Sequence, residues 1–305
     1  MVEAMIHHTA VEDTVATVHV DGAAFMPIGQ PLDLQATLES GQAFRWRRDQ
    51  GWYWGVIGRH SYALYQVEGG LLFRTSAPST AEALAELHAL LRLDDDLEAI
   101  CRDMAADKPL SEAVARHRGL RLLRQDPWEC LASFICSSAS NIPRISRNVN
   151  SVAEAYGEPV SLEGRRLWRF PGAERVAEAG EKALLGLGLG FRAGYLANTA
   201  TRVAEGRVDL MALRLAPYSE AKAVLMELPG VGDKVADCVL VFSLDKLEGF
   251  PIDRWVRRAL EEWYGHREKA QYRELLEWAQ ERWGQRAGYA QQYLFHHLRL
   301  LSKGS

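Results

Sequence analysis

The chain has 305 residues, 48% of them hydrophobic, and a formal net charge of -4 at pH 7. This size and apolar content predict a soluble globular protein with two domains, and the acidic balance argues against indiscriminate binding to polyanions. No apolar run reaches the roughly 18 residues of a spanning helix, and residues 1–30 lack the pattern of a secretion signal, so we expect a cytoplasmic protein, nucleoid-associated in a prokaryote.

Short runs rich in β-branched and aromatic residues recur from Thr14 to Thr75, separated by glycines or polar turns. This pattern predicts an antiparallel sheet. Residues 80–93 show helical periodicity, and the three aspartates at 94–96 indicate the start of another short helix rather than a set of metal ligands. Together these elements predict a first domain over residues 1–112.

Beyond residue 112 the pattern is mainly helical, which predicts an α+β protein with a helical second domain over residues 113–305. Tight turns are expected at 170–172 and 186–190, where proline and glycine cluster. The predicted helices span residues 127–138, 143–156, 173–180, 192–205, 217–226, 233–243, 254–264, 270–283 and 287–300.

Four cysteines, Cys101, Cys130, Cys136 and Cys238, fit neither a disulfide framework nor paired zinc-ligand spacing. A four-cysteine iron–sulfur cluster after Cys238 is excluded, because no cysteine follows it. Arginines, in contrast, cluster along the middle of the chain. They are candidate phosphate contacts or solvated surface charges, and the pattern does not decide between the two: Arg116, Arg118, Arg121, Arg124, Arg144, Arg147, Arg165, Arg166 and Arg169.

A glycine-rich turn at 229–232, Pro-Gly-Val-Gly, joins two predicted helices. Gly230 and Gly232 would let the backbone approach a phosphate closely, and the N-terminus of the second helix would face the same anion. This arrangement is typical of a helix-hairpin-helix that grips nucleic acid without reading its sequence. An ordinary turn between two helices is the alternative.

Lys234 begins the second helix of this hairpin. A lysine is a nucleophile only when its amine is neutral, and the positive end of a helix disfavours the charged form. The position therefore favours amine catalysis, although a cation that contacts phosphate could stand there too. Cys238 lies one turn further along the same face, where a packing role is the simpler interpretation.

Asp253 follows Pro251 and precedes another helical pattern, so its simplest role is an N-cap worth about 1 kcal/mol. The two roles of cap and catalyst are compatible. A carboxylate held by backbone N–H groups is expected to stay ionised, and it could stabilise the positive charge that grows on a sugar as its base departs.

With these residues in view, the chain resembles the helix-hairpin-helix DNA glycosylases, and among them the 8-oxoguanine DNA glycosylases. The similarity extends from Leu32 to Phe295. It includes Ser-Gly-Gln-Ala-Phe-Arg-Trp-Arg at 40–47, Asp-Pro-Trp-Glu-Cys-Leu-Ala-Ser-Phe-Ile-Cys-Ser-Ser at 126–138 and Leu-Gly-Leu-Gly-Phe-Arg-Ala at 187–193.

The resemblance implies that Lys234 attacks the sugar C1′ of a flipped nucleotide, expels 8-oxoguanine and forms a Schiff base that nicks the strand by β-elimination. Asp253 would assist this step. The carbonyl of Gly41, otherwise a plain turn glycine, would sense the N7–H that distinguishes 8-oxoguanine from guanine. Gln291 would bond to the base, and Phe295 and Cys238 would pack on its two faces.

On the DNA side, the resemblance implies that one group of residues fills the gap, contacts the unpaired cytosine or grips the backbone. These are Asn141, Arg144, Phe191, Arg192, Gly230, Gly232 and Trp255. The sequence departs from the animal pattern at Ala139 and Ser140, which stand in place of asparagines, at Phe191, which replaces a tyrosine, and at Trp255, which replaces a histidine.

The expected partner is double-stranded DNA that contains 8-oxoguanine. No association with a membrane is expected, and the chain is expected to act as a monomer. No cofactor is required, because an amine and a carboxylate suffice for this chemistry. The family likeness also suggests a structural cation at the carbonyls of the hairpin. Two alternatives stay open: a glycosylase for another modified purine, and a non-catalytic DNA-binding protein.

Overall fold

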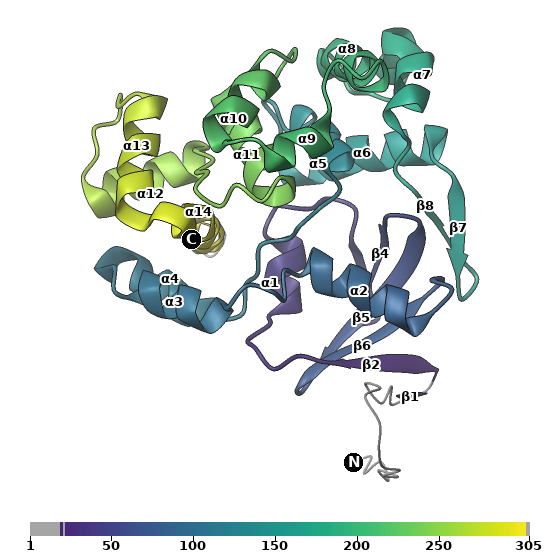
Figure 1. Cartoon of the computed structure of the whole chain (residues 1–305), viewed down its shortest axis with the longest axis horizontal. Helices are drawn as coiled ribbons and strands as arrows, with labels where there is room; N and C mark the ends of the chain where they lie inside the picture. The colour runs from purple at the N-terminus through teal and green to yellow at the C-terminus, as the bar shows by residue number, and fades with distance from the viewer. Residues whose placement is uncertain (1–18, 21, 303–305) are drawn as a thin grey trace.

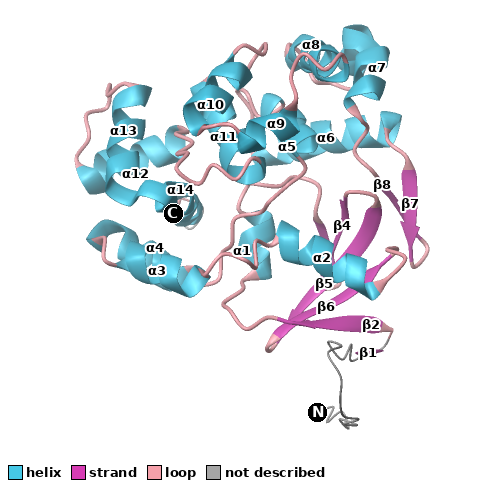
Figure 2. Ribbon diagram, in the orientation of Figure 1, coloured by secondary structure: helices cyan, strands magenta, loops and turns pink. Residues whose placement is uncertain are grey.

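The computed structural model describes residues 19–20 and 22–302, and an antiparallel sheet forms its N-terminal part (Figures 1 and 2). Within these residues the sheet has six strands in the order β1-β2-β6-β5-β4-β3. The strands are β1 (His19–Val20), β2 (Ala23–Pro27), β3 (Arg47–Asp49), β4 (Trp52–Ile57), β5 (His60–Val67) and β6 (Gly70–Thr75). The predicted sheet is confirmed, and the part of its predicted span before residue 19 lies outside the described residues.

Helices make up most of the remaining chain, which confirms the α+β class (Figure 2). Those before and around the sheet are α1 (Leu34–Glu39), α2 (Thr80–Leu90), α3 (Leu97–Ala105) and α4 (Lys108–Arg116). Those of the helical part are α5 (Pro127–Ile135), α6 (Ile142–Tyr156), α7 (Ala173–Gly186), α8 (Arg192–Ala204), α9 (Leu210–Leu215), α10 (Tyr218–Met226), α11 (Asp233–Ser243), α12 (Arg254–Tyr264), α13 (Tyr272–Trp283) and α14 (Ala287–Leu301), with a 3-10 turn η1 (Gly284–Arg286).

Each helix predicted beyond residue 112 is present, with ends shifted by a few residues. The helix predicted at 173–180 continues to Gly186 across a kink at Gly180, where φ is 72°. The sequence analysis missed α1, α4 and α9. It also missed a hairpin of β7 (Pro159–Leu162) and β8 (Arg165–Trp168), whose four-residue strands are too short to show an alternation.

The sheet and the helical part meet along a well-ordered junction. The predicted domain boundary near residue 112 falls inside α4, which contacts α14, while β7 and β8 contact β5 and β4 (Figure 1). Arg121 lies fully buried at this junction, where its guanidinium donates to the carbonyls of Leu91 and Asp95 over 2.7 and 2.9 Å. Neither of the two roles left open for Arg121, phosphate contact or solvated surface charge, fits this position, because protein carbonyls surround its guanidinium.

Four of the eight other arginines of the middle region form ion pairs, as the solvated-charge interpretation expects. Arg118 pairs with Glu98, Arg124 with Asp94 and Asp245, Arg165 with Asp49, and Arg169 with Glu158.

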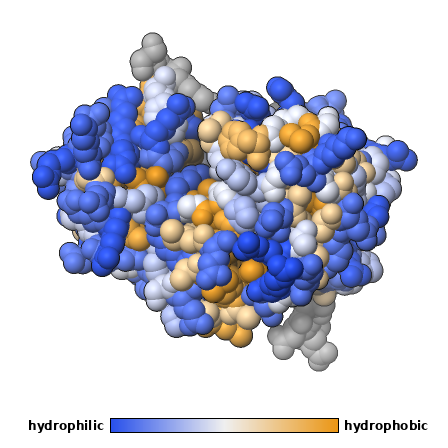
Figure 3. All heavy atoms as spheres, turned by 90° about the horizontal axis from the view of Figure 1, so that it is seen from above, coloured by the Kyte–Doolittle hydropathy of each residue, from blue (hydrophilic) through white to orange (hydrophobic). Residues whose placement is uncertain are grey.

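The surface seen from above is mainly polar, with apolar patches between the charged side chains (Figure 3). Exposed large apolar side chains include Leu185, Phe191, Met211 and Leu215. Among the residues that the structure describes, no helix combines the length and apolar character that crossing a membrane requires.

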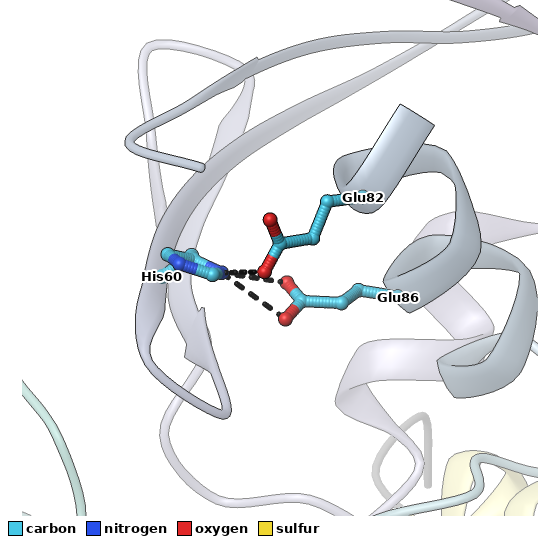
Figure 4. Close-up of side chains that lie close together, drawn as sticks. All are labelled: His60, Glu82 and Glu86. Atoms are coloured by element: carbon cyan, nitrogen blue, oxygen red, sulfur yellow. Dashed lines mark hydrogen bonds and ion pairs between the residues drawn. The ribbon is translucent and has the colours of Figure 1, made fainter. Parts of the chain in front are cut away.

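A polar contact ties α2 to the edge of β5 (Figure 4). His60, the first residue of β5, points at two glutamates that lie one turn apart on α2. Its Nδ1 lies 3.1 Å from Glu86 Oε1 and 3.9 Å from Glu82 Oε1. Glu86 also accepts a hydrogen bond of 2.5 Å from the Tyr62 hydroxyl. These contacts fix α2 on the sheet, whose apolar side chains, among them Leu64 and Phe73, pack in one core with Leu87.

Candidate active site

A cavity of about 520 Å³ opens where the sheet domain meets the helical part. Segments far apart in the sequence line it, including the turn after α1, the α5–α6 loop, α11, the start of α12 and α14. Eight of the predicted site residues lie on its wall: Gly41, Asn141, Lys234, Cys238, Asp253, Trp255, Gln291 and Phe295. The fold therefore brings together the residues that the sequence assigned to catalysis and to base recognition.

The hairpin between α10 and α11 places the N-terminal part of α11 at this cavity. Gly230 adopts a φ of 78°, and a Cβ there would overlap the ring of Tyr195 on α8. Gly232 is the N-cap of α11, and its carbonyl accepts the first bond of the helix from Ala236 N–H over 3.0 Å. The hairpin thus needs a glycine at 230 for conformation and for packing. A cation at its carbonyls stays a prediction.

Lys234 stands in the first turn of α11 and is half-buried. Its Nζ donates to the Ser137 hydroxyl over 3.2 Å and lies 5.1 Å from the centre of the Phe134 ring. Cys238 is buried one turn further on, and this burial raises the pKa of its thiol to about 12, against the opposing effect of Lys234. Cys238 therefore stays an uncharged packing group.

Asp253 is the N-cap of α12, as predicted. One carboxylate oxygen accepts from the N–H groups of Trp255 and Val256, both over 2.9 Å. Burial raises the pKa of Asp253, while these bonds and the charge of Lys234 oppose the rise. The expected N–H bonds are present, but burial works against the ionised form that the sequence analysis expected.

Gly41 lies in a turn directly after α1 with a φ of 79°. A Cβ at this position would come within 2.9 Å of the Ile142 side chain and 3.3 Å of the Phe295 ring. The turn is anchored on both sides, since the Gln292 amide donates to the Ser40 carbonyl over 3.0 Å and the buried Gln42 amide donates to the Arg121 carbonyl over 2.8 Å.

Gln291 and Phe295 lie one turn apart on α14, as their spacing predicted. Gln291 is buried, yet its Oε1 has no hydrogen-bond partner among the described residues. A buried acceptor without a donor costs free energy, so this atom is suited to a donor from a bound molecule. Phe295 offers its half-buried ring beside it.

Ser137 and Arg299 are among the wall residues that were not predicted from the sequence. Ser137 receives the hydrogen bond of Lys234. Arg299 follows Phe295 by one turn, lies 5.6 Å from the centre of its ring and donates to the Glu39 carbonyl over 2.7 Å. The spacing of four residues was the available signal for Arg299, whereas Ser137 is set by tertiary contact alone.

The residues predicted to contact DNA are more scattered. Asn141 caps α6 by accepting from Arg144 N–H over 3.0 Å, and Arg144 itself is exposed. Phe191 is the N-cap of α8 and is 56% exposed. Trp255 lines the cavity under the guanidinium of Arg254, 4.8 Å from its ring centre.

Arg192 differs from its predicted role. It is 1% exposed, and its guanidinium donates to the carbonyls of Ser138, Ala139 and Leu189, over 2.7 Å from Nε to Ser138. In this structure Arg192 holds the α5–α6 loop instead of facing the DNA side, because three carbonyls converge on it. A contact with an unpaired cytosine would require it to leave them.

Two family models match the chain. The model described as "8-oxoguanine DNA glycosylase, N-terminal domain" matches residues 26–131. The model described as "HhH-GPD superfamily base excision DNA repair protein" matches residues 132–285. The two matches meet between residues 131 and 132 and together cover strands β3 to β6, the hairpin and Asp253.

Curated relatives are similar over much of the chain. The "N-glycosylase/DNA lyase OGG1" of Arabidopsis thaliana is 36% identical over 74% of the chain, which spans 64% of that relative's length. The "probable N-glycosylase/DNA lyase" of Methanothermobacter thermautotrophicus is 30% identical, over 90% of the chain and 95% of the relative.

Among solved structures, the 8-oxoguanine glycosylase/lyase of Clostridium acetobutylicum, in complex with double-stranded DNA containing cytosine opposite 8-oxoG, has a TM-score of 0.89. It is 28% identical, and the match covers 95% of this chain and all of that one. A 3-methyladenine DNA-glycosylase of Archaeoglobus fulgidus has a TM-score of 0.77 at 22% identity, over 91% and 99% of the two chains, and this likeness shows the fold alone.

Proposed function

The chain belongs to the 8-oxoguanine DNA glycosylase family, and from that premise we propose that it excises 8-oxoguanine from duplex DNA and then cleaves the strand as a lyase. One observation supports this function most. An amine and a carboxylate from different helices, Lys234 and Asp253, share a cavity with the unpaired acceptor of Gln291 and the ring of Phe295.

The chemistry begins with a nucleotide flipped into this cavity, because C1′ is out of reach inside the base stack. The neutral Nζ of Lys234 forms a bond to C1′, and the bond from C1′ to the base breaks, so that the base leaves with the electron pair and takes up a proton. The ionised carboxylate of Asp253 stabilises the positive charge on the sugar during this step. The sugar then opens to a Schiff base on Lys234. Loss of a proton from C2′ expels the 3′ phosphate.

Base recognition is assigned to the opposite wall of the cavity. The 8-oxoguanine ring stacks on Phe295, Gln291 Oε1 accepts from the base, and the carbonyl of Gly41 accepts from its N7–H. Guanine has an acceptor at N7, so its N7 and the carbonyl oxygen of Gly41 would be two acceptors facing each other. Discrimination therefore rests on one hydrogen bond that the Gly41 carbonyl gains or loses.

The hairpin, Asn141, Arg144 and Phe191 form the DNA-facing part of the proposal. Backbone N–H groups at the N-terminus of α11 bind a phosphate of the damaged strand, and the exposed ring of Phe191 enters the space that the flipped nucleotide vacates. We place the enzyme with the cell's DNA and expect a monomer, which sedimentation would test. The chemistry needs no cofactor, since lysine and aspartate supply the reacting groups.

Borohydride trapping on a duplex with 8-oxoguanine opposite cytosine tests this function. The wild-type chain should form a covalent adduct, and Lys234→Gln should lose it, with a fall in excision of about 10³-fold or more. Lys269→Gln removes a charge from an exposed lysine outside the cavity and should trap normally. An adduct that persists in Lys234→Gln would take Lys234 out of this role.

Matched duplexes that differ only in 8-oxoguanine or guanine test the recognition. Release of 8-oxoguanine alone is expected, and equal release of both bases would contradict the role of Gly41. Duplexes with alkylated purines test the alternative of a glycosylase for another modified purine. None of the cavity residues described above favours that alternative.

A further inference from the structure

Asp237 is a fully buried carboxylate in α11, three residues after Lys234. Its oxygens are both taken: Oδ1 accepts from the Tyr218 hydroxyl over 2.5 Å, and Oδ2 accepts from the Tyr272 hydroxyl over 2.6 Å and from Lys222 Nζ over 3.0 Å. The carboxylate thus binds α11 to α10 and to α13 at once. The cavity wall does not include any of these four residues.

One lysine faces two carboxylates in this cluster. Lys222 Nζ also lies 3.1 Å from Asp233 Oδ1 and 5.0 Å from the centre of the Tyr272 ring. Burial raises the pKa of Asp237, and Lys222 and the two tyrosine hydroxyls oppose this rise. A buried ion pair contributes little net stability compared with apolar packing, and such groups are in some proteins retained because they specify one geometry.

Tyr272 extends the cluster to the other reacting group. Its hydroxyl donates to Asp237 and accepts a hydrogen bond from the backbone N–H of Ile252 over 3.2 Å. Ile252 directly precedes Asp253. A continuous path of hydrogen bonds therefore connects the helix of Lys234 with the segment of Asp253, through one hydroxyl group.

We propose that Asp237 and Tyr272 are positioning residues, which hold the Lys234 helix and the Asp253 segment at the spacing that base excision requires. The inference rests on the proposed function and adds to it. Lys234 begins one helix and Asp253 caps another, so no local rule of helix geometry sets the distance between their side chains. The hydroxyl of Tyr272 sets it by contacting both elements.

Tyr272→Phe tests this role with little change in shape. The ring stays in place and Asp237 keeps Tyr218 and Lys222. The variant loses one donor to Asp237 and the two contacts of the hydroxyl with the 250–253 segment, to Ile252 N–H and, over 3.3 Å, to the Phe250 carbonyl. A displacement of reacting groups by about 1 Å can cost roughly 10²-fold in rate. We expect single-turnover excision of 8-oxoguanine to slow by about 10- to 100-fold, while the Kd for the same DNA, measured with the uncleavable abasic analogue tetrahydrofuran, changes less than about threefold.

Two matched variants separate positioning from a general loss of stability. Tyr218→Phe removes a donor from the same carboxylate but does not touch the 250–253 segment, and it should slow excision less. Tyr264→Phe removes a 3.0 Å bond from another half-buried tyrosine to Asp107, outside the cavity, and should leave excision unchanged. Equal rates in Tyr272→Phe and Tyr264→Phe, or losses that merely follow the free energy of unfolding, would overturn the proposal.

Hydrogen exchange gives a second measurement, which does not need an active variant. The peptide that spans residues 250–256 should exchange faster in Tyr272→Phe than in wild type and unchanged in Tyr264→Phe. Unaltered exchange in Tyr272→Phe would overturn the proposed link. The wild-type reaction separates the two hypotheses. If the wild-type protein releases no 8-oxoguanine, the proposed function fails and this inference fails with it. If the wild-type protein is active and Tyr272→Phe excises at the same rate, only this inference fails.

Discussion

Asp253 serves two purposes that make opposite demands on its charge. As a cap it accepts two N–H bonds, and as a charge stabiliser it has to be ionised in a buried place. Because burial raises the pKa of Asp253, ionising this carboxyl group costs more free energy in the folded protein than in the unfolded chain. The contribution of Asp253 to the free energy of unfolding is therefore fully present only below the ordinary pKa of an aspartate, and it is lost as the pH rises through the raised pKa.

Asp253→Asn is therefore expected to lose activity and gain stability. An asparagine caps the helix but cannot stabilise a cation, so excision should fall by about 10²- to 10³-fold. The free energy of unfolding at pH 7.5, measured with urea, should rise, because the variant avoids a buried charge. Asp209→Asn is the control, since Asp209 accepts the same pair of cap bonds in an exposed position. A loss of stability confined to Asp253→Asn would contradict this account.

The same raised pKa predicts an acid limb in the excision rate. As the pH falls through the pKa of Asp253, the carboxylate takes up a proton and the rate falls with it. Single-turnover rates from pH 4.5 to 8 should locate the midpoint of this limb above the ordinary range of an aspartate. A rate that stays flat down to pH 4.5 would show that another group, or no titration, limits the reaction.

Gly41→Ala tests the closeness of the turn to the base-stacking ring. A methyl group at 41 would press on Ile142 and Phe295, so excision should drop by at least about tenfold. Gly164→Ala provides the comparison, because Gly164 has a similar φ of 75° and no atom within 4 Å of a Cβ. Both variants should lose similar stability from backbone strain, of order 1 kcal/mol, and only Gly41→Ala should lose activity. Equal activity in the two would remove the steric argument.

At the scale of elements, the hairpin joins DNA binding to catalysis, since its last turn starts the helix of Lys234. Gly230→Ala would force the added methyl group into the Tyr195 ring and shift the α10–α11 turn. We expect DNA binding to weaken by about tenfold or more at moderate salt, in fluorescence anisotropy with undamaged duplex. Gly265→Ala, at a φ of 72° with open space around it, should bind normally. Unchanged affinity in Gly230→Ala would argue against a role of the hairpin in binding.

Local pattern predicted the long elements and failed for the short ones. The α11 and α12 helices were predicted within a residue, because caps and periodicity agree there. In contrast, α1 and α9 have six residues each, which is fewer than two turns and too short for a helical repeat to show. The same limit applies to the site. Lys234 and Asp253 were found from their helix starts, but Ser137 and the burial of Arg192 depend on contacts between distant segments, which no spacing reveals.

At the scale of the whole molecule, neutral histidines join α4 to α14. His117 Nε2 lies 3.1 Å from His297 Nδ1, and both rings are buried. Burial lowers the pKa of His117 to about 4 and also lowers that of His297. The unfolded chain takes up protons near pH 6.5 and the folded protein does not, so the stability is present above that pH and is lost as the pH falls toward about 4.

Urea unfolding at several pH values should show this loss, at up to about 1.4 kcal/mol for each pH unit from His117 over that range, with a further loss in the same direction from His297. His117→Phe keeps a ring in place and should flatten the dependence between pH 7 and 5, whereas the exposed His88→Phe should leave it as in wild type. An unchanged slope in His117→Phe would assign the pH dependence to other groups.

The turn at Gly41 is clamped rather than adaptable. Gln292 and Arg299 of α14 hold the carbonyls of Ser40 and Glu39 on either side of the α1 terminus. The sheet-side turn and the helix that carries Gln291 and Phe295 thus form one preset template. A chimera that carries the turn of another glycosylase on this scaffold would lose these anchoring hydrogen bonds unless α14 were exchanged with it. A change in the base that the enzyme recognises therefore requires paired substitutions in two segments that are remote in the sequence.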